Sequence, residues 1–290
     1  MTSVGAIFLP SFPPEALRGV ATAADDAGLE QLWLWEDCFK ESAVAAMSAA
    51  LAWTERLRVG IGLMPVPMRN AAALAMETAT LERLFPGRPI VGVGHGVLDW
   101  MGQIGARAAS PLTLLGEQLD AVRALLRGEE VTTEGRYVRL DRVRLDWPPQ
   151  HAPAVLAGAE GPKTLALVGA RADGVILPGG TTPDRVREAL GIAREARDAA
   201  GATGPFEAVV FVPAAFGADA GERLAANARR WRFPEGRLLG VAGSPAEVAD
   251  GLRPWIDAGV TSLVLQPMDD EPDPEAYVRT VGREVAPLLA

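Results

Sequence analysis

Short apolar runs alternate with longer amphipathic stretches from one end of the chain to the other. Each run is followed by a stretch whose apolar positions recur at helical spacing. This alternation predicts a parallel β-sheet whose strands are joined by helices. The eight runs that we predict as strands lie at residues 4–10, 31–37, 57–66, 88–94, 153–158, 173–179, 206–216 and 261–267.

The number of strand and helix units distinguishes two α/β architectures. Eight units within 290 residues predict a single closed (β/α)8 TIM barrel. The alternative, an open doubly wound sheet, places a glycine-rich dinucleotide loop after its first strand. At that place this chain has LPSFPPEA, with two adjacent prolines and no glycine. We therefore predict one barrel domain over residues 1–290.

Residues 129–150, EEVTTEGRYVRLDRVRLDWPPQ, interrupt the repeat of strands and helices. The polar Glu134-Gly135 pair within this segment is typical of a turn between two short strands. We predict a short hairpin insertion here, before the fifth barrel strand.

The charge balance limits the classes of partner. The chain has 37 Asp and Glu against 28 Lys and Arg, and this net charge of −9 disfavours nucleic acid and anionic membranes. No apolar run approaches the ~18 residues of a membrane span, and the N-terminus lacks the pattern of a secretory signal. We expect a cytoplasmic protein. The single cysteine, Cys38, allows neither an intrachain disulfide nor a multi-cysteine zinc site.

The carboxyl ends of the predicted strands place the candidate chemistry at one end of the barrel. Glu36 and Asp37 follow the second strand, and His95 stands between Gly94 and Gly96 after the fourth. These ends hold no group of three histidines or carboxylates, so we expect no metal site. Their apolar, glycine-rich lining suits a flat cofactor with an anionic tail and a small-molecule substrate.

The loop after the fifth strand, AGAEGPKT at residues 157–164, is the best candidate for an anion site. Gly158 and Gly161 allow the backbone to approach a ligand closely, and Lys163 and Thr164 add donors where a helix begins. The loop after the eighth strand, QPMDDEPD, carries acidic side chains that would repel a phosphate.

Several segments, taken in order, resemble the luciferase-like flavin-dependent superfamily. VGVGHG resembles the family's GVGSG signature after strand four, and METATLERLFPGR resembles its ATL…L-S-x-G-R segment. Similar matches are LTLLGEQLDAVRALLRGEEVTTEGRYVRL, AGAEGPKTLALVGARADGVIL and SPAEVADGLRPWIDAGVTSLVL. The resemblance covers nearly the whole chain, and the ordered set is more specific than any single segment.

The resemblance implies a barrel that binds FMN or the deazaflavin coenzyme F420, with the ring at the strand ends. It also implies a non-prolyl cis peptide near residues 61–63. Carried over to this chain, contacts with the ring fall on Glu36, Asp37, Gly62, Met64, Gly94, His95 and Gly96. Contacts with the phosphate fall on Ala157, Gly158, Ala159, Gly161 and Gly179.

The catalytic residues are less well defined, because the chain departs from the family pattern. Many F420-dependent relatives have an Asp-His pair after strand two, where this chain has Glu36-Asp37-Cys38, and some have a glutamate where Val97 stands. A carboxylate desolvated beside a cofactor can still have a raised pKa. We therefore expect Asp37 or Glu36 to carry a proton, and His95 to contact the cofactor or donate a proton.

The favoured function is that of an F420-dependent oxidoreductase, which transfers a hydride between the deazaflavin and a small organic substrate. The first alternative is an FMN-dependent monooxygenase or reductase, for which a separate reductase would supply reduced flavin. A cofactor-binding protein without turnover and a barrel enzyme acting on a phosphorylated sugar also remain open. Relatives of this type are commonly dimers, so the resemblance implies a homodimer.

Overall fold

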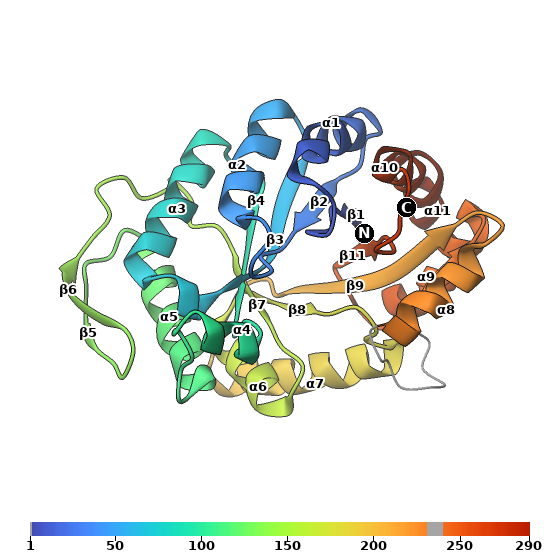
Figure 1. The fold of residues 1–290 in the computed structure, drawn as a ribbon. Coiled ribbons are helices and arrows are strands. Elements are labelled where there is room, and N and C mark those ends of the chain that lie inside the picture. The colour runs from blue at the N-terminus through green and yellow to red at the C-terminus, as the bar shows by residue number, and fades with distance from the viewer. Residues whose placement is uncertain (1, 231–239) are drawn as a thin grey trace.

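Eight parallel strands form a closed barrel in the computed structural model, which describes residues 2–230 and 240–290 (Figure 1). Their order around the barrel is β1-β2-β3-β4-β7-β8-β9-β11, and β11 pairs with β1 to close it. The strands are β1 Ser3–Ile7, β2 Gln31–Leu34, β3 Arg58–Pro65, β4 Pro89–Gly94, β7 Val155–Gly158, β8 Gly174–Leu177, β9 Glu207–Phe216 and β11 Ser262–Gln266. The predicted TIM barrel is confirmed.

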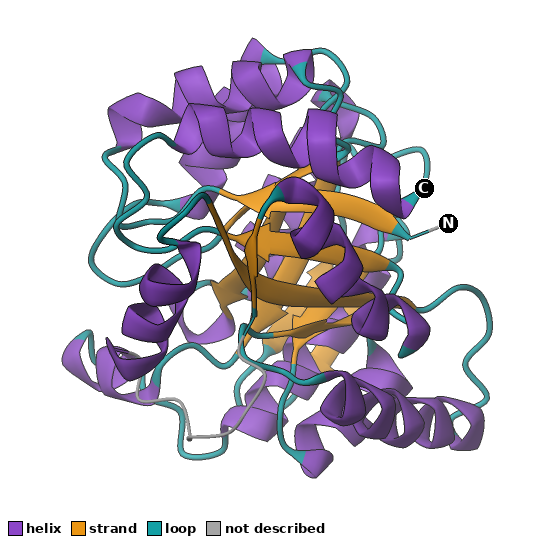
Figure 2. Cartoon of the chain, turned by 90° about the vertical axis from the view of Figure 1, so that its right-hand side faces the viewer, coloured by secondary structure: helices purple, strands orange, loops and turns teal. Residues whose placement is uncertain are grey.

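Helices surround the barrel and cover the outer face of its strands (Figure 2). The longer ones are α1 Leu17–Asp26, α2 Ala43–Trp53, α3 Ala71–Leu84, α5 Pro111–Leu126, α6 Pro162–Arg171, α7 Pro183–Ala199, α8 Ala220–Arg230 and α9 Pro245–Asp257. The C-terminal segment forms α10 Pro274–Thr280, a π-helical turn at Val281–Val285 and α11 Ala286–Leu289. Within residues 2–230 and 240–290, no helix has both the length and the apolar character needed to cross a bilayer.

Strands β2 and β4 are buried along their whole length, which explains why their sequences are nearly continuous apolar runs. Trp33 of β2 fills part of the barrel interior, where Gly60 leaves room for its indole ring. The Trp33 indole N–H donates to Gln31 Oε1 at 2.8 Å, so its buried polar atom is satisfied.

The predicted hairpin insertion is confirmed as β5 Val131–Glu134 and β6 Arg139–Val143, which lie at the edge of the molecule beyond α3 and α5 (Figure 1). Glu117 of α5 fastens its turn, because the carboxylate accepts from the backbone N–H groups of Arg136, Tyr137 and Val138 at 2.8 to 2.9 Å. Burial works against ionisation of Glu117, but these three hydrogen bonds prevail and lower its pKa.

Three features of the third strand shape the barrel mouth. The peptide bond between Gly62 and Leu63 is cis, as the family resemblance implies. The pairing of β3 with β4 shifts register between Ile61 and Met64. The Leu63 carbonyl then accepts from the Glu36 backbone N–H at 3.3 Å, which ties the end of β3 to the end of β2.

Two elements of the described chain were not predicted from the sequence. A short helix, α4 Leu98–Gln103, precedes α5, and a three-residue strand, β10 Val241–Gly243, pairs in parallel with the C-terminal end of β9. Helix α9 starts with a capping box formed by Ser244 and Glu247.

Candidate active site

The predicted site residues lie at one end of the barrel because all its strands run parallel. Glu36 and Asp37 follow β2, the Gly62–Leu63 peptide lies near the end of β3, and His95 follows β4. Gly158 ends β7, and Gly161 begins α6. The structure therefore gathers at a single mouth the segments that the sequence assigned to a cofactor.

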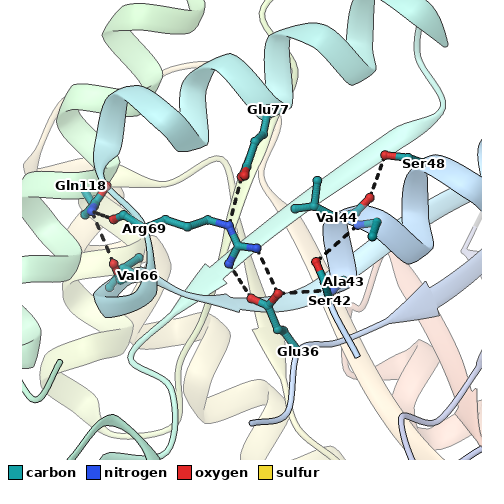
Figure 3. A network of polar contacts seen from close by, with 10 residues as sticks. Glu36, Ser42, Ala43, Val44, Ser48, Val66, Arg69, Glu77 and Gln118 are labelled. Carbon is teal, nitrogen blue, oxygen red and sulfur yellow. Dashed lines mark hydrogen bonds and ion pairs between the residues drawn. The ribbon is translucent and has the colours of Figure 1, made fainter. Parts of the chain in front are cut away.

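Glu36 is held in a buried ion pair with Arg69, which follows β3 (Figure 3). The guanidinium donates to both carboxylate oxygens, at 2.5 Å to Oε2 and 3.0 Å to Oε1. The Ala43 backbone N–H at the start of α2 also donates to Glu36 Oε1, at 3.3 Å. Glu36 was expected to be a proton carrier, yet its oxygens are occupied by structural donors.

Two further helices extend this ion pair into a network that we call the brace, formed by Glu36, Arg69, Glu77 and Gln118 (Figure 3). Glu77 of α3 accepts from Arg69 Nε at 3.0 Å. Gln118 of α5 donates to the Arg69 carbonyl at 2.8 Å. The brace thus joins β2, the loop after β3, α3 and α5, and fixes two of the loops that form the mouth.

Asp37, the neighbour of Glu36, has a different environment. Burial raises its pKa, while the side chain of Trp35 and the charge of Lys40 act in the opposite direction. Nearby Asp269 raises the pKa further by charge repulsion. Asp37 is thus a carboxyl group that can gain or lose a proton at this end of the barrel.

His95 bridges the loop after β4 to the start of α6. Its Nε2 lies 3.3 Å from Thr164 Oγ1. Its Nδ1 is buried and has no hydrogen-bond partner in the described part of the chain. Burial lowers the pKa of His95, and the backbone of Pro111 near the ring acts in the opposite direction. The Pro111 backbone does not have the geometry of a hydrogen bond with Nδ1. The lowered pKa favours the neutral imidazole, and one of its ring nitrogens is buried without a partner.

The segment Gly158–Gly161 and the first turn of α6 form what we call the anion loop. Gly161 is the N-cap of α6 and supplies no side-chain cap, and Pro162 occupies the first helical turn. The first N–H groups of a helix have no partner within the helix, and they favour an anion. A Cβ atom placed on Gly161 would meet no atom within 4 Å, so the backbone here borders open space.

The other site glycines have protein neighbours. A Cβ atom on Gly94 or Gly158 would overlap the side chain of Leu63, and one on Gly179 would crowd Gln266. A Cβ atom on Gly62 would crowd Phe211 and Trp33. These glycines therefore accommodate side chains of the barrel mouth, and Gly161 is the one of this set that borders free volume.

The remaining predicted cofactor residues are buried in the strand ends. Met64 is 2% exposed, Ala157 is fully buried and Ala159 is 5% exposed, so these three residues offer a ligand little accessible surface. Gly96 adopts a φ of +69°, which a glycine tolerates, and lies close to Pro65.

Leu63 is a site residue that the sequence did not single out as a cofactor contact. It is partly exposed at the mouth, and its side chain covers Gly94 and Gly158. It lies within the register shift of β3, where simple strand alternation no longer indicates which side chains point inward.

The chain has relatives among curated proteins. It is 28% identical over 322 residues to the F420-dependent glucose-6-phosphate dehydrogenase of Kineococcus radiotolerans, covering 96% of this chain and 94% of that protein. It is 28% identical over 173 residues to the 5,10-methylenetetrahydromethanopterin reductase of Methanolobus tindarius. That match covers 60% of this chain and 53% of the relative, so the chain spans about half of its length.

A solved structure shows the same fold over the full chain. An F420-dependent secondary alcohol dehydrogenase, in complex with an F420-acetone adduct, superposes with a TM-score of 0.88. The two proteins are 20% identical, and the match covers 100% of this chain and 99% of that one. Residues 2–237, most of the chain, match the family described as luciferase-like monooxygenase, and the chain belongs to that family.

Proposed function

We propose that this protein is an F420-dependent oxidoreductase, which transfers a hydride between the deazaflavin and a small organic substrate. The observation that carries the proposal is the position of His95, whose Nε2 lies near Thr164 at the uncapped start of α6 and whose Nδ1 is unpartnered, at the mouth that also holds Asp37. The relative that matches along 96% of this chain is named as an F420-dependent enzyme, which favours the deazaflavin over FMN.

The residues at the mouth fit a flat cofactor that ends in an anionic tail. His95 and the backbone at Gly161 would hold the phosphate, since both border the anion loop and one leaves a buried nitrogen unsatisfied. Leu63 would give an apolar surface to the ring. When bound, the deazaflavin supplies a ring carbon that accepts or gives up a hydride.

Asp37 is the group that we assign to proton transfer. Removal of a hydride from an alcohol carbon leaves the hydroxyl proton to be accepted, and the Asp37 carboxylate would accept it. In the direction of reduction the Asp37 carboxylic acid would return that proton to the carbonyl oxygen. Glu36 would position this loop rather than exchange protons, because Arg69 and Ala43 occupy its oxygens.

The side chains at the rim of the mouth favour an organic substrate of limited polarity. Phe39, Met68 and Val97 follow three different barrel strands, and they are 68%, 39% and 47% exposed. Exposed apolar side chains gathered around a mouth are typical of a ligand-binding surface.

Fluorescence titration of the purified protein with oxidised F420 and with FMN tests the proposed cofactor. We expect tight binding of F420 and weak binding of FMN, followed by reduction of bound F420 by an alcohol donor. Preference for FMN, together with oxygen uptake on addition of reduced flavin, would establish the monooxygenase alternative instead. Tight F420 binding without reaction with any donor would indicate a binding protein.

We also propose that the protein is a homodimer in which the exposed side of α2 and α3 is covered. Trp53, Met76 and Leu84 on these two helices are 40%, 60% and 65% exposed. Sedimentation equilibrium of the wild type and of Met76→Glu tests this proposal. We expect a dimer that the glutamate dissociates, and a monomeric wild type would contradict it.

A further inference from the structure

A cavity of about 380 Å³ lies behind the loop that follows β3. Its walls come from this loop, from the connection between α4 and α5, from α5 and from the turn of the hairpin insertion. The residues that matter for its chemistry are Val66, Arg69, Arg107, Leu114, Gln118 and Tyr137. The hairpin therefore completes a site that the barrel alone would leave open.

Gln118 gives this cavity an unsatisfied acceptor. The residue is 3% exposed, and its Oε1 has no hydrogen-bond partner among the described residues. The amide cannot be turned around to correct this, because Nε2 donates to the carbonyls of Arg69 and Val66. A buried carbonyl oxygen without a donor is costly, and a ligand N–H would relieve that cost.

Arg107 supplies a positive charge at the same cavity. It is exposed, and no ion pair or hydrogen bond of its side chain is found in residues 2–230 and 240–290. Arg69 differs, because Glu36 and Glu77 already occupy its guanidinium. Arg107 is thus the cationic group in this cavity that a ligand carboxylate could reach.

Helix α5 runs from the His95 side of the anion loop to the cavity. Pro111, whose backbone lies beside the His95 ring, begins α5. Leu114 and Gln118 follow on the same helix, and seven residues of helix span about 10 Å. A chain that starts from an anion held at His95 would reach the cavity within a few residues.

The tail of coenzyme F420 has the matching chemistry. It continues from the phosphate through a lactyl group to glutamates joined by amide bonds, so each glutamate carries an amide N–H and at least one carboxylate. We propose that this cavity binds the glutamate tail, with an amide N–H donated to Gln118 Oε1 and a carboxylate paired with Arg107. This inference rests on the proposed function, because it assumes that the deazaflavin is the cofactor.

The test compares dissociation constants, measured by fluorescence, for F420 without glutamates and with several. We expect the wild type to bind the longer form about five- to tenfold more tightly, as for one charge-assisted contact that is partly exposed to solvent. Arg107→Gln should abolish that gain and leave the affinity for the glutamate-free form unchanged. The matched control is Arg136→Gln, which removes the charge of an arginine on the hairpin turn, next to Tyr137 but outside the cavity lining. This variant should keep the gain.

The outcomes separate this inference from the proposed function. Equal affinity for the two forms of the wild type would overturn the tail site and leave the cofactor assignment intact. The tail site would also be overturned if the tighter binding of the longer form survived in Arg107→Gln, or if it were lost equally in Arg136→Gln. Either result would place the tail elsewhere. Failure of every form of F420 to bind would overturn both.

Discussion

The brace and the anion loop lie at the same end of the barrel, but they differ in whether their buried polar atoms have hydrogen-bond partners. In the brace, Glu36 accepts three hydrogen bonds and the guanidinium of Arg69 is shared between two carboxylates. Beside the anion loop, His95 Nδ1 stays without a partner and the start of α6 has no side-chain cap. Satisfied buried groups hold a structure in place, whereas unsatisfied ones are available to a ligand.

Removal of the positive charge from the brace should give the largest effect. Arg69→Met leaves Glu36 buried without its partner, and we expect a loss of about 3–5 kcal/mol in the free energy of unfolding. Urea denaturation measures this loss. The matched control is Arg142→Met, in which an exposed pair with Asp141 is broken, and its loss should stay within about 0.5 kcal/mol. Equal losses in the two variants would mean that the brace does not hold the mouth.

Substitution of the two adjacent acids separates positioning from proton transfer. Asp37→Asn should lower kcat by about 100-fold or more, and F420 should still bind, because the amide cannot exchange the substrate proton. In the wild type, the raised pKa of Asp37 predicts that oxidation of an alcohol accelerates as the pH rises through that pKa. Glu36→Gln should lower stability and keep this pH dependence. If Asp37→Asn retains full turnover, Asp37 has no place in the reaction.

Two glycines of the anion loop offer a finer comparison. Gly161→Ala enters open space with a φ of −81°, so stability should change by less than about 0.5 kcal/mol. Affinity for FMN or F420 should fall about tenfold, because the methyl group would occupy the path of the phosphate. Gly158→Ala should lower stability as well, since its methyl group meets Leu63. Thermal unfolding and fluorescence titration together decide whether the two positions differ in this way.

The smallest expected effect is a pH dependence of anion affinity. Because burial lowers the pKa of His95, the imidazole is neutral near pH 7 and becomes protonated as the pH falls. Sulfate, which does not titrate in this range, should bind about threefold more tightly at pH 6 than at pH 7.5. The affinity of His95→Gln should not depend on pH. A pH-dependent His95→Gln would show that another group responds.

Stability of the ligand-free protein should respond to His95 in the opposite sense. The folded protein binds its proton less readily than the unfolded chain, whose histidine titrates near pH 6.5. The contribution of neutral His95 to folding is therefore present above that pH and is lost as the pH falls through the folded-state pKa. Urea denaturation at several pH values, compared with His95→Gln, measures this loss.

The barrel could be predicted from the sequence because each β/α unit carries its own local signals. Apolar runs mark the strands, and pairs such as Ser244 with Glu247 mark helix starts. The candidate anion site followed from Gly161 and Pro162, which also lie close together in the sequence. Short elements such as α4 and β10 have too few residues to show a period.

Contacts between distant segments account for what the sequence could not show. The pair of Glu36 with Arg69 joins residues 33 positions apart, and nothing in either local sequence marks the partner. The position of Leu63 depends on the register shift of β3, and the orphaned oxygen of Gln118 depends on how its amide is oriented. Because the Glu36–Arg69 pair determines which acid is free, the roles of Glu36 and Asp37 could not be distinguished beforehand.

The fastening of the hairpin has an evolutionary consequence. Glu117 holds the turn through backbone N–H groups alone, so most side chains of residues 131–143 can change without loss of that attachment. Selection could therefore exchange this segment for another of different length or chemistry while the catalytic end stays folded. The hairpin is a replaceable part, and a laboratory search for altered ligand preference would do well to begin there.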